Sequence, residues 1–159
     1  FRSNRIFKKM KSSKLNINNS FKTLSGLKIA VVSTYWNEEV IEPMLKDCLA
    51  KLDEYDFETE SFVVPGAYEL PLTAKCLCKT FDAVILLGSI IKGETPHFEI
   101  ISQSISDNVL RTSLEEETPI IFGVLTTNNE SEAKERAAYK GAEFAESALS
   151  TLDTLKKIK

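Results

Sequence analysis

The stretch of sequence that decides the fold is Asp82-Ala-Val-Ile-Leu-Leu87, which leads directly into Gly88-Ser-Ile-Ile-Lys-Gly-Glu-Thr-Pro-His-Phe98. A continuous apolar run, rather than an alternation of apolar and polar residues, is typical of a strand covered on both faces in a parallel sheet. The pair Thr95-Pro96 then favours a helix start, with Thr95 as the N-cap and Pro96 as the first helical residue. We therefore predict a buried strand over 82–87 and a helix over about 96–115.

The same pairing of a short apolar run with a helix-like stretch extends to both sides of this segment. Further strands are predicted over 28–33, 61–64 and 119–125, and further helices over about 38–52, 68–79 and 130–152. Four strand–helix units in alternation predict an open parallel sheet that is covered on both faces. The expected fold class is thus α/β: a flavodoxin-like, three-layer α/β/α arrangement with a four-stranded parallel sheet flanked by helices.

The first 26 residues differ in charge from the rest of the chain. They hold seven Lys and Arg and no Asp or Glu, whereas the remainder holds 13 basic and 23 acidic residues. We interpret residues 1–26 as a basic, disordered leader, with a remnant of an organelle-targeting peptide as the alternative. Residues 27–159 are expected to form a single domain. The acidic charge of this domain argues against nucleic acid as a partner.

Other functional classes are disfavoured by what the sequence lacks. No apolar run approaches the ~20 residues needed to cross a bilayer, so no membrane partner is expected. Cys48, Cys76 and Cys78 match neither a disulfide nor a zinc pattern. Reduced thiols favour a cytosol-like compartment. We expect a cytoplasmic protein, with organelle targeting by the leader as the alternative.

Unusual residues gather where the predicted strands end, which is where open parallel sheets bind ligands. The only Trp and the only His of the chain lie in these segments, which are 34–37, 65–69, 88–98 and 123–127. Trp36 is either a core aromatic or a stacking platform for a planar ring. Glu69 could simply begin a helix, where a carboxylate is favoured.

His97 falls in the first turn of the helix predicted after Pro96. A helix start offers unpaired N–H groups and the positive end of the helix dipole, which together suit a phosphate. The same dipole disfavours an imidazolium, so we expect His97 to stay neutral and able to accept a proton near pH 7. The alternative is a surface histidine without a role.

Three charged residues of the last helix, Glu132, Arg136 and Lys140, share one face by their spacing of four. One interpretation is a solvated stripe in which Glu132 offsets Arg136. The other is that Arg136 and Lys140 contact a phosphate. The spacing alone leaves both open.

Three motifs resemble one known family, the 6,7-dimethyl-8-ribityllumazine synthases of the penultimate step of riboflavin biosynthesis. They are PGAYELP at 65–71, GSIIKGETPHFE at 88–99, and FGVLTT at 122–127 followed by ERA and KG in the last helix. The resemblance covers residues 27–152 in order. It implies a transferase that condenses 5-amino-6-(D-ribitylamino)uracil with 3,4-dihydroxy-2-butanone 4-phosphate and releases phosphate and water. No metal or organic cofactor is implied.

The resemblance also implies a role for each matching residue. Trp36 would stack on the pyrimidine, His97 would transfer protons, and Phe122 would close the pocket. The ribityl and pyrimidine site would be lined by Ala67, Tyr68, Glu69, Ser89, Ile90 and Ile91. The phosphate would be bound by Glu94 and Thr95, largely through their backbone, and by Arg136 and Lys140. Because the substrate supplies its own amine, no nucleophilic side chain of the protein is required.

The sequence departs from the family in two places. The first is Thr34-Tyr-Trp-Asn37, where many members have an Arg-Phe-Asn type of sequence; Trp36 keeps a stacking face, while Tyr35 lacks the usual positive charge. The second is the late helix, where Arg136 and Lys140 are closer together than is common in the family. Aligning Lys140 requires a deletion, so Arg136 is the better supported phosphate ligand.

The family assembles as pentamers with active sites between neighbouring subunits, so the resemblance implies a homopentamer at minimum. A sixty-subunit shell and an association with riboflavin synthase stay open as further partners. Two other functions stay open as alternatives. They are an archaeal-type riboflavin synthase and a non-catalytic shell protein that binds flavin or lumazine.

Overall fold

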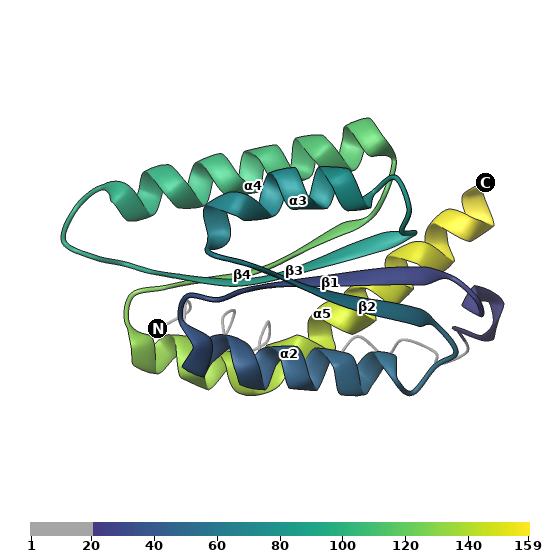
Figure 1. Cartoon of the computed structure of the whole chain (residues 1–159), viewed down its shortest axis with the longest axis horizontal. Coiled ribbons are helices and arrows are strands. Elements are labelled where there is room, and N and C mark those ends of the chain that lie inside the picture. Colours follow the sequence, from purple (N-terminus) through teal and green to yellow (C-terminus); the bar gives the residue numbers. More distant parts are fainter. Residues whose placement is uncertain (1–20) are drawn as a thin grey trace, which may run out of the picture.

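Four parallel strands form one sheet in the order β2-β1-β3-β4 in the computed structural model, which describes residues 21–159 (Figure 1). The strands are β1 (Lys28–Thr34), β2 (Glu58–Val64), β3 (Ala83–Ile91) and β4 (Ile120–Thr127). In the register of the sheet, Ile29 lies opposite Ala83 and Val84 opposite Ile120. The predicted α/β class with a four-stranded parallel sheet is confirmed.

Helices cover both faces of the sheet, which gives three layers. Helices α2 (Glu38–Leu52) and α5 (Glu130–Ile158) lie on one face, and α3 (Leu70–Leu77) and α4 (His97–Glu116) on the other (Figure 1). Two short 3-10 helices, η1 (Phe21–Leu24) and η2 (Ala67–Glu69), complete the described chain. The helix predicted over 68–79 is therefore divided into η2 and α3, and the last helix continues beyond the predicted end at 152.

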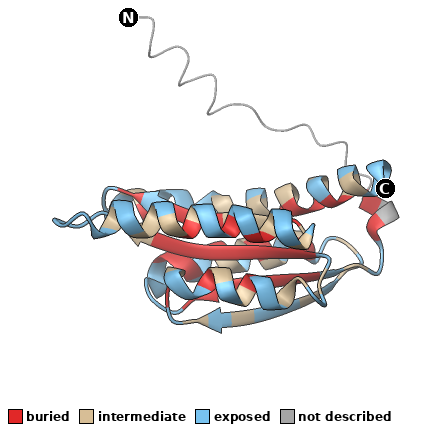
Figure 2. Ribbon diagram, turned by 90° about the horizontal axis from the view of Figure 1, so that it is seen from above, coloured by how far each residue is buried: buried red, intermediate tan, exposed pale blue. Residues whose placement is uncertain are grey.

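The two central strands form the core. Residues Ile29–Val32 of β1 and Ala83–Leu87 of β3 are fully buried, and Figure 2 shows a buried strand running between the helical layers. Strand β2 lies at an edge of the sheet and alternates between exposed and half-buried residues. Because an edge strand is partly exposed, its first half, Glu58–Ser61, can be polar. The sequence pattern therefore predicted a strand over 61–64 only. Strand β3 runs on to Ile91 because it pairs with β4 as far as Thr127.

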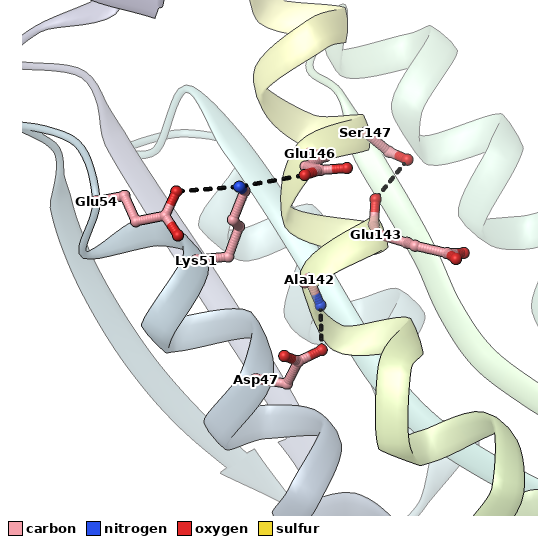
Figure 3. Close-up of polar contacts among 7 residues, drawn as sticks. All are labelled: Asp47, Lys51, Glu54, Ala142, Glu143, Glu146 and Ser147. Atoms are coloured by element: carbon pink, nitrogen blue, oxygen red, sulfur yellow. Dashed lines mark hydrogen bonds and ion pairs between the residues drawn. The ribbon is translucent and has the colours of Figure 1, made fainter. Parts of the chain in front are cut away.

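Helices α2 and α5 approach one another to backbone contact. A side chain on Gly141 would collide with the carbonyl oxygen of Met44 and lie 2.8 Å from the Cys48 nitrogen. Beside this point the Ala142 N–H donates to Asp47 Oδ2 at 2.6 Å (Figure 3). One turn further along α2, Lys51 bridges to Glu54 at 3.0 Å and to Glu146 of α5 at 3.2 Å. The two helices are thereby joined by polar as well as apolar contacts.

The end of the expected leader folds onto the domain. Phe21 and Leu24 are buried, and the Phe21 ring meets the Tyr55 ring edge-on with centroids 5.4 Å apart. The boundary expected at residue 26 therefore lies too late, because these two apolar side chains join the core. Residues 1–20 lie outside the described part of the chain. Within residues 21–159, no helix has the length and apolarity of a membrane span.

Candidate active site at the carboxyl ends of β1 and β3

The loops that follow β1, β2 and β3 lie along one edge of the sheet (Figure 1). Strands β1 and β3 are neighbours, but the chain leaves β1 for α2 on one face and leaves β3 for α4 on the opposite face. Such a switch point opens a crevice beyond the strand ends, and ligands of doubly wound sheets bind there. The sequence placed its unusual residues at this edge, and the structure brings most of them together there.

Trp36 stands at the end of β1 with 63% of its surface exposed. The Trp36 N–H donates to the Pro65 carbonyl at 3.0 Å, and the preceding Tyr35 N–H donates to Val64 at 2.8 Å. These bonds continue the β1–β2 pairing into the loops. The indole lies against the backbone of Gly66. The interpretation of Trp36 as a core aromatic is therefore wrong, and its exposed surface is available to stack on a planar ring.

Asn37 ties the ends of β1 and β3 together, a role that the sequence analysis missed. It adopts the left-handed conformation, with φ 64° and ψ 41°, as the cap of α2. Its side-chain Nδ2 donates to the Ser89 carbonyl at 3.1 Å. Asparagine tolerates the left-handed region better than most residues, so an Asn between a strand and a helix was the available signal.

The loop after β2 is held by Glu69. Its Oε2 accepts the Gly66 N–H at 3.0 Å, and its carbonyl accepts the Thr73 hydroxyl at 2.9 Å. Ala67 is half-buried. Tyr68, in contrast, is 65% exposed and lines a groove of about 470 Å³ between α3 and α4. The structure thus directs Tyr68 into that groove.

Ser89 brings an unsatisfied hydroxyl to the end of β3. Its Oγ is buried and has no hydrogen-bond partner within residues 21–159, a state that it shares with Ser102. Ile90 packs under α3 and α4, whereas Ile91 packs under α2 and α5. Since side chains alternate along a strand, Ser89 and Ile91 share the α2/α5 face of the sheet.

The loop from β3 to α4 is exposed from Lys92 to His97. The Lys92 N–H donates to the Thr127 carbonyl at 2.9 Å, and its Nζ lies 3.6 Å from Glu99. Glu94 and Thr95 follow, and both are exposed. The loop therefore leaves its side of the crevice open to solvent.

Helix α4 begins at His97, one residue later than predicted. Pro96, with φ −68° and ψ 5°, occupies the N-cap position, and no side chain caps the helix. Thr95 therefore does not serve as the N-cap; instead the Pro96 carbonyl accepts the first helical hydrogen bond, from Ile100 at 3.2 Å. The N–H groups of the first turn have no partner inside the helix. His97 lies in that turn, as predicted, and it is exposed.

Three expected site residues lie elsewhere in the chain. Phe122 pairs with Leu86 in the middle of β4 and packs under α3 and α4. Arg136 is exposed on α5, which covers the face opposite to α4, and it has no polar partner among the described residues. Lys140 binds Glu143 at 2.5 Å and lies 5.5 Å from the centre of the Tyr139 ring. Among residues 21–159, no hydrogen bond, ion pair or ring contact joins these side chains to Trp36 or His97.

Glu132 does not offset Arg136, contrary to one interpretation of the charged stripe. Its Oε2 accepts the Asn128 N–H at 3.0 Å, while its own N–H donates to Asn129 Oδ1 at 2.9 Å. The bond to Asn129, which is the N-cap residue, and the bond from the preceding Asn128 together cap the start of α5. The Arg136 guanidinium is therefore left available for an anion.

Comparison with known proteins identifies relatives along most of the chain. A model of the 6,7-dimethyl-8-ribityllumazine synthase family matches residues 26–156. Relatives with this name occur in Thermobifida fusca, at 40% identity over 84% of this chain and 83% of theirs, and in Coxiella burnetii, at 39% identity over 86% and 96%. The relative from Deinococcus radiodurans is 37% identical over 84% of this chain and 90% of its own.

Proposed function

Since the chain belongs to the 6,7-dimethyl-8-ribityllumazine synthase family, we propose that the edge formed by the β1, β2 and β3 loops is its active site. The chain is an enzyme of riboflavin biosynthesis. It condenses 5-amino-6-(D-ribitylamino)uracil with 3,4-dihydroxy-2-butanone 4-phosphate. An amine of the pyrimidine forms an imine with the ketone and releases one water. Elimination of phosphate and ring closure, which releases a second water, then give the lumazine.

The observation that carries this assignment is the pairing of an exposed ring with an open helix start at one edge of the sheet. Trp36 offers an aromatic surface, and the first turn of α4 offers unpaired N–H groups beside His97. A planar pyrimidine and a phosphate are the two groups that these features suit. Holding both substrates together and moving protons is the catalysis that this condensation needs.

The remaining roles follow the same geometry. The buried Ser89 hydroxyl would find its missing partner in a polar group of the pyrimidine or ribityl chain, beside Ala67, Glu69, Ile90 and Ile91. The backbone of Glu94 and Thr95 would extend the phosphate site from the start of α4. The position of Tyr68 does not itself support a role in pyrimidine binding, because Tyr68 lines the groove between α3 and α4.

The proton-transfer role of His97 can be tested on the two-substrate reaction. His97→Ala should lower kcat by about 10²–10⁴-fold, the range of a lost acid–base group, while binding of the pyrimidine changes little. His97→Gln is the matched control, since it keeps hydrogen-bonding groups but cannot carry a proton at neutral pH. Equal losses of kcat and of pyrimidine binding would make His97 a binding residue instead.

Phe122, Arg136 and Lys140 would reach the pocket from a neighbouring copy of the chain. Support comes from their separation from His97 within one chain and from the unpaired, exposed guanidinium of Arg136. Arg136→Ala should therefore raise the KM for the phosphorylated ketone. An unchanged KM would place the phosphate away from Arg136.

Mixed assemblies separate a shared pocket from one built within a chain. Subunits with His97→Ala and subunits with Arg136→Ala would be unfolded, mixed in equal amounts and refolded together. In a shared pocket, about a quarter of the sites combine an intact His97 with an intact Arg136 from the neighbour, so activity rises above that of either variant. Activity that stays at the average of the two variants would contradict the shared pocket.

Exposed apolar side chains support an assembly of several subunits. Leu72 of α3 and Ile100, Leu110 and Leu114 of α4 are each at least 62% exposed and lie on one side of the sheet. Apolar groups gathered in this way mark a protein interface. We propose a homopentamer, and the particle mass measured by light scattering at micromolar concentration tests it. A monomer would overturn the assembly, while larger masses would reveal a shell or a complex with riboflavin synthase.

A cytoplasmic location is supported by the thiols. Cys48, Cys76 and Cys78 are all free, which is the usual state in a reducing compartment.

A further inference from the structure

The six-membered ring of the Trp36 indole lies directly against Gly66, in the loop after β2. A Cβ atom built on Gly66 would lie 2.5 Å from Cε3 and 2.6 Å from Cζ3 of the indole. Non-bonded carbon atoms normally stay about 3.5–4.0 Å apart, so no side chain fits between the ring and this backbone. The rest of the Trp36 surface is exposed, at 63% of the residue.

The backbone conformation of Gly66 does not itself require glycine. Its φ of −147° and ψ of −178° lie in the extended region that other residues adopt freely. Its N–H is held by Glu69 Oε2 at 3.0 Å, a bond that any residue except proline could make. Position 66 therefore requires a glycine because the indole occupies the space that a side chain would fill.

The backbone of Trp36 is held by hydrogen bonds at both its N–H and its carbonyl group. Its N–H donates to the Pro65 carbonyl at 3.0 Å, and its own carbonyl accepts the Thr34 hydroxyl at 3.2 Å. The next residue, Asn37, is bonded to the end of β3 at 3.1 Å. If a methyl group were added to Gly66, the indole would have to rotate, because its backbone is held in place.

We propose that Gly66 is a positioning residue for ring binding: its bare backbone sets the plane of the Trp36 indole and thereby the surface on which a planar pyrimidine stacks. The proposal rests on the proposed function for the nature of the ring. The contact between Gly66 and Trp36 itself is independent of any ligand. The two can accordingly be tested apart.

The first experiment uses Trp36, the only Trp of the chain, as its own reporter without a ligand. Gly66→Ala should shift the emission maximum and change acrylamide quenching, because the ring leaves the loop surface, while the circular dichroism spectrum stays that of the wild type. An unchanged emission and quenching would overturn the proposal. This result does not depend on whether the protein makes lumazine.

The second experiment measures binding of the product, 6,7-dimethyl-8-ribityllumazine, in a double-mutant cycle. Gly66→Ala should weaken binding by about 3–10-fold, the range of one aromatic stacking contact. In a Trp36→Ala background the same change should cause no further loss, since no indole remains to be displaced. Equal losses in both backgrounds would show that Gly66 acts without Trp36 and would overturn the proposal.

Steady-state kinetics and folding provide the remaining controls. Gly66→Ala should raise the KM for the pyrimidine but leave the KM for the phosphorylated ketone unchanged; an equal rise in both would overturn the proposal.

Should Gly66→Ala fail to fold, the Trp36→Ala/Gly66→Ala double variant should fold, because the indole that collides with the added methyl group is absent. A double variant that also fails to fold would show that Gly66 serves the loop alone. A wild-type chain without synthase activity would remove the proposed function and leave the fluorescence result intact.

Discussion

The two helical layers of this protein differ in how far their apolar side chains are buried. On the α2/α5 side the helices touch backbone to backbone at Gly141, and a continuous buried cluster fills the space above the sheet. On the α3/α4 side a groove of about 470 Å³ separates the helices, and Leu72, Leu110 and Leu114 are exposed. Lys75 spans that side through a solvent-exposed ion pair with Glu115 at 3.0 Å. We propose from this difference that the α3/α4 layer is the main contact with a neighbouring subunit, beside the contact proposed above for Arg136 and Lys140 of α5.

The largest loss of stability is expected at the crossing of α2 and α5. Gly141→Ala would gain about 1 kcal/mol on an isolated helix, because alanine favours a helix over glycine. Here the added methyl meets the Met44 carbonyl, so we expect a net loss of about 2–3 kcal/mol in the free energy of unfolding. Urea unfolding at one fixed protein concentration measures it. A stabilised Gly141→Ala protein would mean that the helices lie further apart.

A smaller loss is expected when the polar link beside this crossing is removed. Asp47→Ala leaves the half-buried Ala142 N–H without its carboxylate acceptor, which should cost about 1–2 kcal/mol. Asp47→Asn keeps an acceptor oxygen and should recover most of that loss. Hydrogen exchange at the Ala142 amide is the local readout, and an Asn variant as unstable as the Ala variant would argue against the hydrogen bond.

A substitution in the α3/α4 layer should change the assembly of subunits rather than the stability of the folded chain. Leu114→Lys changes a side chain that is 70% exposed, so the unfolding free energy of the separated chain should change by less than about 0.5 kcal/mol. The particle mass, in contrast, should fall as the apolar contact is lost. Ala50→Lys adds the same charge to an exposed position of α2, away from Arg136 and Lys140, and serves as the control. If both variants lose the assembly equally, the α3/α4 side is not the interface.

Thiol chemistry gives the mildest test, since it leaves the fold intact. Cys48 lies on the buried side of α2, and this burial raises the pKa of its thiol to about 12, so at pH 8 only about one thiol in 10⁴ would be ionised. Cys76 of α3 is exposed, and Cys78 is half-buried, with its pKa raised by burial. A thiol reagent should therefore modify Cys76 quickly, Cys78 slowly and Cys48 only in denaturant. Rapid modification of Cys48 would show that the α2/α5 layer opens readily.

The sequence predicted the central elements better than those at the edges. Strands β1 and β3 are buried on both faces, so their apolar runs were easy to recognise. The first half of β2 was missed because an edge strand carries exposed polar residues such as Glu58 and Glu60. The extension of β3 to Ile91 depends on pairing with β4, and no local pattern in the sequence records that pairing.

The sequence could predict which strand-end residues belong to the candidate site, but it could not predict the contacts between them. Trp36 and His97 were found because each is the only residue of its type and each follows a strand. The bond from Asn37 to Ser89 and the fit of the indole on Gly66 join residues of different loops, so the linear sequence could not show them. The position of Thr95 was misjudged because Pro96 takes the cap position of α4.

The contact between α2 and α5 also has a consequence for synthesis of the chain on the ribosome. Asp47 and its partner Ala142 are 95 residues apart in the sequence. At about 5–20 residues per second, the apolar side of α2 stays uncovered for roughly 5–20 s before the residues that cover it have been made. The nascent chain during that interval is a natural client for a chaperone, and a message truncated before α5 would yield a product that aggregates or is degraded.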